Sequence, residues 1–197
     1  MTQVTAYTNE GRYKCLEDLP IDSAELSLGY CGWERCYPGH RFGPNKRTHY
    51  ALHIITNGKG KLEKNGEVFH LTTGDAFLLC PEEEAWYEAD KKEPWAYAWI
   101  GLYGYKVKKV MQYAGFSKEK SIRSLKCTAL LKSYVDEILE VHRLTTEESM
   151  RRNGYLNLFL ATLIEDNEKF NTKTMPEHTY PGTVYVEHAM EYIKHHY

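Results

Sequence analysis

The chain has 197 residues, of which 42% are hydrophobic and 26% are charged, a balance typical of folded globular proteins and not of disordered chains. Its formal net charge of -2 excludes the strongly basic character of phosphate-backbone binding proteins, so these residues alone should bind nucleic acid poorly. No stretch is apolar enough to predict a transmembrane helix, and residues 1–10 lack the pattern of a secretory signal. We therefore expect a cytoplasmic protein that makes no membrane contact.

The cysteines are odd in number, and no two of them have the CxxC spacing. This pattern argues against a disulfide framework and against a structural zinc site. Free thiols are therefore predicted at Cys15, Cys31, Cys36, Cys80 and Cys127.

Residues 1–25 have weak periodicity and predict an N-terminal arm that lies on another part of the molecule. Residues 26–103 contain short β-rich runs separated by turn signals such as Asn57-Gly58, which favour tight hairpins. Many short strands at close spacing predict an antiparallel sandwich or barrel. The predicted strands are 26–30, 50–56, 60–63, 68–71, 76–80 and 95–103.

Residues 104–170 have a hydrophobic period of about 3.6, which predicts helices: a short one near 105–113 and then two long amphipathic helices that form a helical hairpin. The first long helix should bury Leu125, Ala129 or Leu130, Tyr134, Ile138 and Val141. The second should bury Leu156, Phe159 or Leu160, Leu163, Asn167 and Phe170.

Residues 171–182 carry prolines and a glycine without apolar periodicity, and they predict a linker. In residues 183–197, apolar side chains repeat at helical spacing, but nothing that follows could cover them. This pattern indicates the truncated start of a second domain. The alternative is a C-terminal helix that packs on the first domain.

The segment from Trp95 to Tyr103 is the most informative for function. Side chains alternate between the two faces of a strand, so Trp95, Tyr97, Trp99 and Tyr103 share one face, opposite an aliphatic face. A small barrel either fills its interior or leaves a cavity for one small ligand. Aromatic rings with polar edges suit a sugar, whose C–H faces stack on them. An aromatic-rich core with satisfied polar tips explains the pattern equally well.

Other strands should supply a polar complement to these rings, and the candidates are Glu34, Arg47, His53 and Tyr87. An arginine beside a cavity offers up to five donors to sugar hydroxyls or to a carboxylate, although Arg47 could instead form a surface ion pair. A single histidine in an apolar strand, such as His53, is more often a core residue than a ligand contact. The acidic run 82–84 is most simply a solvated loop.

Enzyme signatures such as GxSxG, HExxH, the Walker loop and GxGxxG are absent. Histidines and carboxylates recur at metal-ligand spacing only at Glu187-His188 and His195-His196, which we expect on a solvated helix face. No catalytic residue, metal ligand or cofactor is therefore predicted.

Several segments resemble the cupin-type N-terminal domain of AraC-family transcription regulators: 49–60 with its Asn57-Gly58 turn, 71–75 (LTTGD), 77–81 (FLLCP) and 95–99 (WAYAW). Residues 31–44, together with Arg47, are similar to a branch that regulates raffinose, melibiose and multiple-sugar operons in Gram-positive bacteria. Residues 186–197 resemble the first helix of that family's helix-turn-helix DNA-binding domain.

The resemblance implies an α+β fold, in which a cupin-like antiparallel β-barrel (jelly roll) at 26–103 is followed by a helical hairpin for dimerisation at 104–170. It also implies an arm that can close over the effector. The family's pocket tryptophan and neighbouring histidine fall at Trp99 and Tyr97, and its tyrosine falls at Tyr87. Its threonine falls near Cys31, and its pocket arginine falls at Gly43, so Arg41 or Arg47 must replace that arginine.

The predicted partners are a sugar effector of the α-galactoside or related oligosaccharide class, a second copy of the chain, and DNA only through a C-terminal domain. The predicted ligand-binding residues are Glu34, Arg47, His53, Tyr87, Trp95, Tyr97 and Trp99. The alternative is a metal-dependent cupin enzyme acting on a sugar, which would need an HxH pair and a later histidine. His49 and His53 have the wrong spacing for that pair, and Trp86 occupies the later position.

Overall fold

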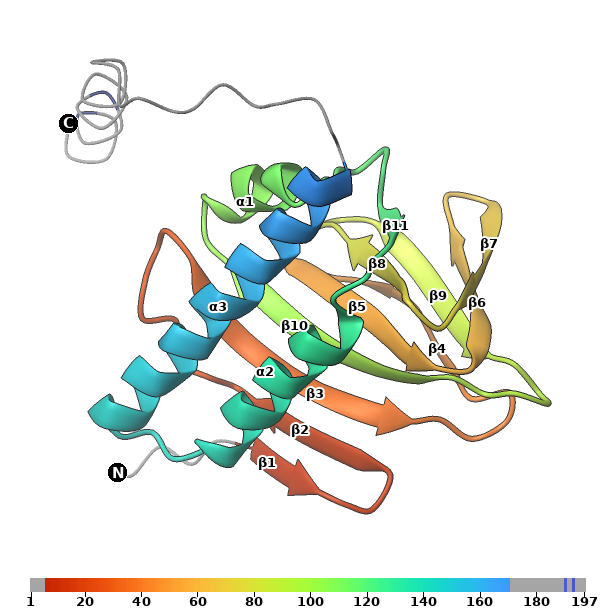
Figure 1. Cartoon of the computed structure of the whole chain (residues 1–197), viewed down its shortest axis with the longest axis horizontal. Helices are drawn as coiled ribbons and strands as arrows, with labels where there is room; N and C mark the ends of the chain where they lie inside the picture. The colour runs from red at the N-terminus through yellow and green to blue at the C-terminus, as the bar shows by residue number, and fades with distance from the viewer. Residues whose placement is uncertain (1–5, 171–189, 191–192, 194–197) are drawn as a thin grey trace.

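The computed structural model of the chain describes residues 6–170 together with Met190 and Ile193. The predicted linker at 171–182 lies outside the described residues, as does the predicted start of a DNA-binding domain at 183–197 apart from those two positions. Two antiparallel sheets face each other, and the helices cover the outer face of the larger one (Figure 1). Among the described helices, none is both long and apolar enough to cross a membrane.

The larger sheet has seven strands in the order β1-β2-β3-β10-β5-β8-β11. They are β1 (Ala6–Asn9), β2 (Tyr13–Glu17), β3 (Ser27–Arg35), β5 (Tyr50–Asn57), β8 (Asp75–Leu79), β10 (Ala96–Tyr103) and β11 (Ile122–Ser124). β1 and β2 form a hairpin at the sheet edge, where β2 pairs with β3 (Figure 1). Residues 6–17 of the predicted arm are thus part of the sheet.

The smaller sheet has four strands in the order β4-β9-β6-β7. They are β4 (Arg41–Lys46), β6 (Lys59–Lys64), β7 (Glu67–Thr72) and β9 (Glu84–Ala89). The strands β1, β2, β4, β9 and β11 were not among those predicted. β4 is exposed along its whole length, and the buried positions of β9 include the small side chains of Ala85 and Ala89, so neither strand carries a strong hydrophobic alternation.

The helices are α1 (Val107–Tyr113), α2 (Thr128–Glu140) and α3 (Thr146–Phe170). α2 and α3 pack together over the larger sheet, which confirms the predicted α+β class with a β-barrel followed by a helical hairpin (Figure 1). In α3, the predicted buried residues Leu156, Phe159, Leu160 and Leu163 are confirmed.

The face predicted for the first long helix is confirmed only in part, because Leu125 and Ile138 are buried as predicted but Ala129 and Leu130 are exposed. α2 buries Leu131, Val135, Ile138 and Leu139, whereas Leu130 is exposed. The error arises because β11 pairs with β8 immediately before this region, which keeps the chain extended. Leu125 therefore lies ahead of the helix rather than on its first turn.

The alternation along β10 divides the core as predicted. Ala98, Ile100 and Leu102 lie in the core between the larger sheet and the helices. Tyr97 and Trp99 lie in the second core, between the two sheets. The inner face of β10 therefore supplies the aromatic side of the barrel interior.

The prediction that residues 82–84 form a solvated loop is wrong for Glu83. Its carboxylate is buried and lies 2.9 Å from Nζ of Lys64, which is also buried. Oε2 of Glu83 accepts a hydrogen bond from the backbone N–H of Cys80, and Nζ of Lys64 donates to the carbonyl of Lys118. A buried charge of this kind is tolerated because it is paired and hydrogen-bonded.

Candidate effector site

Five of the predicted ligand-binding residues form one aromatic wall between the sheets. We call these residues the inner wall: His53, Tyr87, Trp95, Tyr97 and Trp99. His53 on β5 stacks on Phe77, with ring centroids 4.6 Å apart, and its ring lies 5.2 Å from Tyr87 on β9. Trp95, just before β10, lies 6.0 Å from Tyr97, which lies 5.6 Å from Trp99. The structure therefore brings these five side chains together from three strands of the two sheets.

Trp99 is the most accessible residue of the inner wall, at 8% exposure, whereas Trp95 is 1% exposed and deepest in the core. Trp99 lies against Gly32 of β3, where a Cβ atom would come within 2.4 Å of its ring. Tyr13 of β2 covers the ring, with centroids 5.8 Å apart. The N-terminal hairpin therefore contacts the inner wall directly.

The polar tips of the inner wall are neutral. Burial lowers the pKa of His53 well below its ordinary value, so its imidazole is uncharged near pH 7. Burial also raises the pKa of Tyr87 and of Tyr97, which keeps both hydroxyls protonated. The hydroxyl of Tyr87 lies 3.3 Å from Nε2 of His53, and that of Tyr97 donates to Oε2 of Glu34 at 3.0 Å. Neutral donors and acceptors of this kind match a hydroxyl-rich ligand.

Arg47 lies at a cavity of about 620 Å³, which we call the Arg47 cavity. This volume is within the usual range for small-molecule sites. Arg47 is 5.2 Å from the ring of Phe42, which stacks on Tyr87 at 5.3 Å, so the cavity adjoins the inner wall. The Arg47 charge also acts on the pKa of Tyr87 and of His53, opposing the effect of burial on Tyr87 and adding to it on His53.

The other side of the Arg47 cavity carries aromatic and imidazole groups. The Tyr30 hydroxyl lies 2.8 Å from Nε2 of His49, and the His49 ring stacks on Tyr103 at 4.5 Å. Burial and the nearby Arg47 charge both lower the pKa of His49. The cavity thus offers a guanidinium, a phenol and an imidazole next to aromatic faces.

Glu34 lies away from Arg47, at a second cavity of about 700 Å³ that adjoins α2. We call it the Glu34 cavity. Its lining includes Cys36 and Tyr97, and it is at the opposite end of β3 and β10 from the Arg47 cavity. The seven predicted residues therefore do not share a single pocket, because Glu34 and Arg47 open into different cavities.

Sequence reasoning missed Tyr13, Tyr30 and Phe42 as parts of the site. Tyr13 belongs to the arm, whose partner no sequence rule predicts, and Phe42 belongs to the exposed strand β4. Tyr30 was within a predicted strand, but it was not predicted to be part of the site. Its only signal was that it lies on the same strand face as Gly32. These residues reach the site through tertiary pairing between distant strands.

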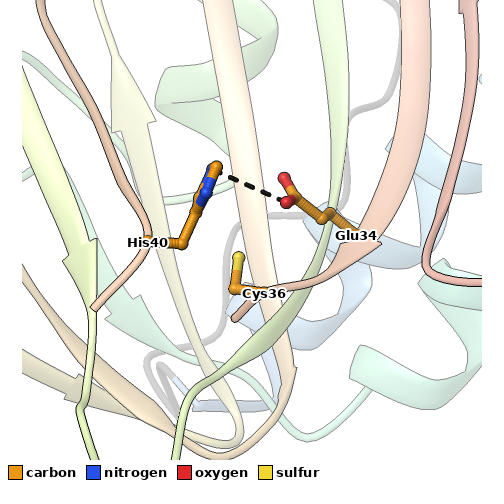
Figure 2. A group of neighbouring side chains, drawn as sticks. All are labelled: Glu34, Cys36 and His40. Carbon is orange, nitrogen blue, oxygen red and sulfur yellow. Dashed lines mark ion pairs between the residues drawn. The ribbon is translucent and has the colours of Figure 1, made fainter. Parts of the chain in front are cut away.

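One group of three possible metal ligands occurs within the described residues, and it consists of Glu34, Cys36 and His40 (Figure 2). His49 and His53 are not part of it, since their Nε2 atoms face Tyr30 and Tyr87. Burial raises the pKa of Cys36 to about 12, while Tyr97 and Trp95 beside the thiol act in the opposite direction.

Known regulators of sugar operons are similar to this chain. The Msm operon regulatory protein of Streptococcus mutans is 33% identical over 150 residues, which is 76% of this chain and 54% of that protein. The raffinose operon transcriptional regulatory protein RafR of Pediococcus pentosaceus is 37% identical over 47% of this chain and 33% of its own length. The lactose operon transcription activator of Staphylococcus xylosus is 35% identical over 45% of this chain and 31% of that protein. The matched region thus spans about half or less of these relatives.

Among solved structures, YhaK from Escherichia coli matches 63% of this chain and 51% of its own, with 18% identity and a TM-score of 0.42. A cupin superfamily protein from Desulfitobacterium hafniense matches 51% of this chain and 76% of its own, with 10% identity and a TM-score of 0.34. A family model described as the AraC-like ligand binding domain matches residues 27–153, which is more than half of the chain. The predicted resemblance is confirmed: the chain belongs to the family of AraC-like ligand binding domains.

Proposed function

We propose that this chain is the ligand-sensing and dimerisation part of an AraC-type regulator of sugar utilisation genes, and that a sugar binds at the Arg47 cavity against the inner wall. The supporting observation is the contact of the Arg47 guanidinium with Phe42, which stacks on Tyr87 of the inner wall. Trp99 is joined to Tyr87 through His53, which lies against both rings. Aromatic faces stack on the C–H faces of a pyranose, while arginine and phenol groups bond its hydroxyls. The relatives are named for Msm, lactose and raffinose operons, and because lactose and raffinose both carry a galactosyl group, these names favour a galactoside. We propose an α-galactoside or a related oligosaccharide.

The proposed mechanism is a linkage between effector binding and the N-terminal hairpin. Tyr13 on β2 contacts Trp99, so a sugar bound against that ring would meet residues of the hairpin. An effector shifts the arrangement of hairpin and dimer only by its differential affinity for the two states. DNA binding in the cytoplasm would come through a domain that begins at residues 183–197.

A metal-dependent cupin enzyme is the competing function, and the described residues favour it less. The histidine pair of such enzymes would require His49 and His53 to converge on one ion, but they contact different tyrosines. The three relatives above are operon regulators by name, and two of them are named as regulators of transcription. We therefore propose that the chain is not an enzyme.

A thermal-shift screen of the chain against mono-, di- and trisaccharides tests the proposed function. A sugar at 100 times its Kd should stabilise the fold by about 2.7 kcal/mol, which a melting curve resolves. We expect one class of galactoside to raise the melting temperature and the others to leave it unchanged. If no sugar raises the melting temperature, the proposed effector class is refuted.

We further propose that α3 pairs with a second copy of the chain. Met150 and Leu158 are 71% and 49% exposed, and Gly154 and Ala161, which are also exposed, continue the same helical face. Leu130 on the neighbouring helix α2 is exposed as well. An apolar stripe on one helix face is typical of a helix–helix interface, and a close approach is easiest beside small residues.

Leu158→Glu is expected to convert the dimer to a monomer at tens of micromolar, because it places a charge in the centre of this stripe. Sedimentation velocity measures the change. Val68→Glu is the control, since Val68 is about equally exposed but lies on β7, away from the helices. A wild-type chain that sediments as a monomer would remove the dimer model.

A further inference from the structure

Glu34, Cys36 and His40 come together in space although their spacing along the chain is not one that predicts a metal site. Glu34 is near the end of β3, Cys36 follows that strand, and His40 directly precedes β4; their side chains point toward one another (Figure 2). One ligand atom from each lies within 4.8 Å of the others, and Nε2 of His40 is 3.5 Å from Oε1 of Glu34. Tetrahedral zinc, with bonds of about 2.0–2.3 Å, separates its ligand atoms by about 3.3–3.8 Å. The group therefore needs only small shifts to hold an ion.

The backbone fixes the positions of these residues. The N–H of His40 donates to the carbonyl of Tyr37 at 3.0 Å, and the carbonyl of His40 accepts from the N–H of Ala89 at 2.9 Å. The N–H of Cys36 donates to the carbonyl of Trp95, and Arg12 donates to the carbonyl of Cys36. Because both ends of the turn are anchored, the three side chains start close to a binding geometry.

Neighbouring side chains support a metal-bound state. Tyr97 donates to Oε2 of Glu34, which orients the carboxylate and leaves Oε1 facing His40. The N–H of Trp95 is buried and has no hydrogen-bond partner among the described residues, although Trp95 lies beside Cys36. A thiolate would accept that donor, and hydrogen bonds of this kind commonly orient metal ligands.

We propose that Glu34, Cys36 and His40 bind a divalent transition metal ion of the zinc type. The thiol, imidazole and carboxylate are all zinc ligands, and a thiolate selects against magnesium and calcium. Three protein ligands leave one position open, and Glu34 and Cys36 both line the Glu34 cavity, so a small ligand in that cavity can reach the ion. This site lies at the opposite end of β3 from the Arg47 cavity, so it goes beyond the proposed sugar site.

Metal titration of the chelator-treated chain tests the proposal. Calorimetry with Zn²⁺ should show one ion bound per chain through these ligands. Co²⁺ should give the intense visible bands of tetrahedral coordination and a near-ultraviolet thiolate-to-cobalt band. His40→Gln and Cys36→Ser should each weaken binding about tenfold or more, and Cys36→Ser should abolish the thiolate band.

The controls are Cys127→Ser and His70→Gln, which remove a partly exposed cysteine and an exposed histidine elsewhere. Both should bind Zn²⁺ as the unaltered chain does. If Cys36→Ser fails to fold, the Zn²⁺ affinity of His40→Gln alone tests the site. His40 is partly exposed, so its replacement should leave the fold intact. Absence of the thiolate band, or Zn²⁺ affinity unchanged in His40→Gln, would overturn the site. The sugar screen uses metal-free protein, so the two proposals fail independently.

Discussion

Trp99→Ala should weaken binding of the stabilising sugar by about thirtyfold. Trp99 is the least buried ring of the inner wall. Loss of a central tryptophan contact typically costs about 2 kcal/mol or more of binding free energy, where 1.4 kcal/mol is tenfold in Kd. Calorimetric titration with that sugar measures the loss. An unchanged affinity for the sugar would contradict the proposal that the sugar binds against the inner wall.

Trp86→Ala is the matched control for this variant. Trp86 is on β9 next to Tyr87 but points away from the interior, where Arg41 lies 4.0 Å above its ring. Its loss should leave sugar affinity unchanged. Removing a buried tryptophan can also cost about 3–5 kcal/mol of stability, so Trp99→Leu, which fills more of the space, serves as a second variant and circular dichroism checks the fold.

Lys64→Met should lower the free energy of unfolding by about 3–5 kcal/mol. The side chains of Lys64 and Glu83 are only 4% and 1% exposed, so removing the ammonium leaves an uncompensated carboxylate in the core. Urea unfolding at neutral pH measures the loss, with an unchanged slope indicating an intact native state.

Two further variants separate charge burial from other effects. The double variant Lys64→Met with Glu83→Leu removes both charges and should recover most of the lost stability, because apolar pairs often replace buried ion pairs without cost. Lys59→Met breaks the exposed pair with Glu93 and should leave the unfolding curve nearly unchanged. A double variant no more stable than Lys64→Met would contradict this explanation.

Strong periodicity explains which parts of the fold could be predicted. The two faces of β10 and the buried face of α3 follow directly from alternation at two and at 3.6 residues. β4 and β9 escaped prediction because β4 is exposed along its whole length and the buried positions of β9 include small side chains, so their place in the sheet depends on pairing with other strands. Glu83 was predicted to be solvated because nothing in its neighbouring sequence indicates that it forms a buried ion pair with Lys64.

In the candidate site, the sequence predicted which side chains share a strand face but not which strands come together. Trp99 and Tyr97 were placed correctly on the inner wall, because a strand fixes which side chains share a face. Tyr13 and Phe42 could not be placed, since they reach the wall only after β2 pairs with β3 and β4 pairs with β9. The meeting of Glu34 with Cys36 and His40 depends on a bend of the chain after β3, which no periodicity encodes.

A crystal structure of the chain with the stabilising sugar tests the central claim most directly. The account predicts a sugar that extends from the Arg47 cavity, where its hydroxyls bond Arg47, to the inner wall, where a pyranose ring lies in van der Waals contact with Trp99. Sugar bound instead in the cavity lined by Lys59, His70 and Lys92, on the smaller sheet, would contradict it.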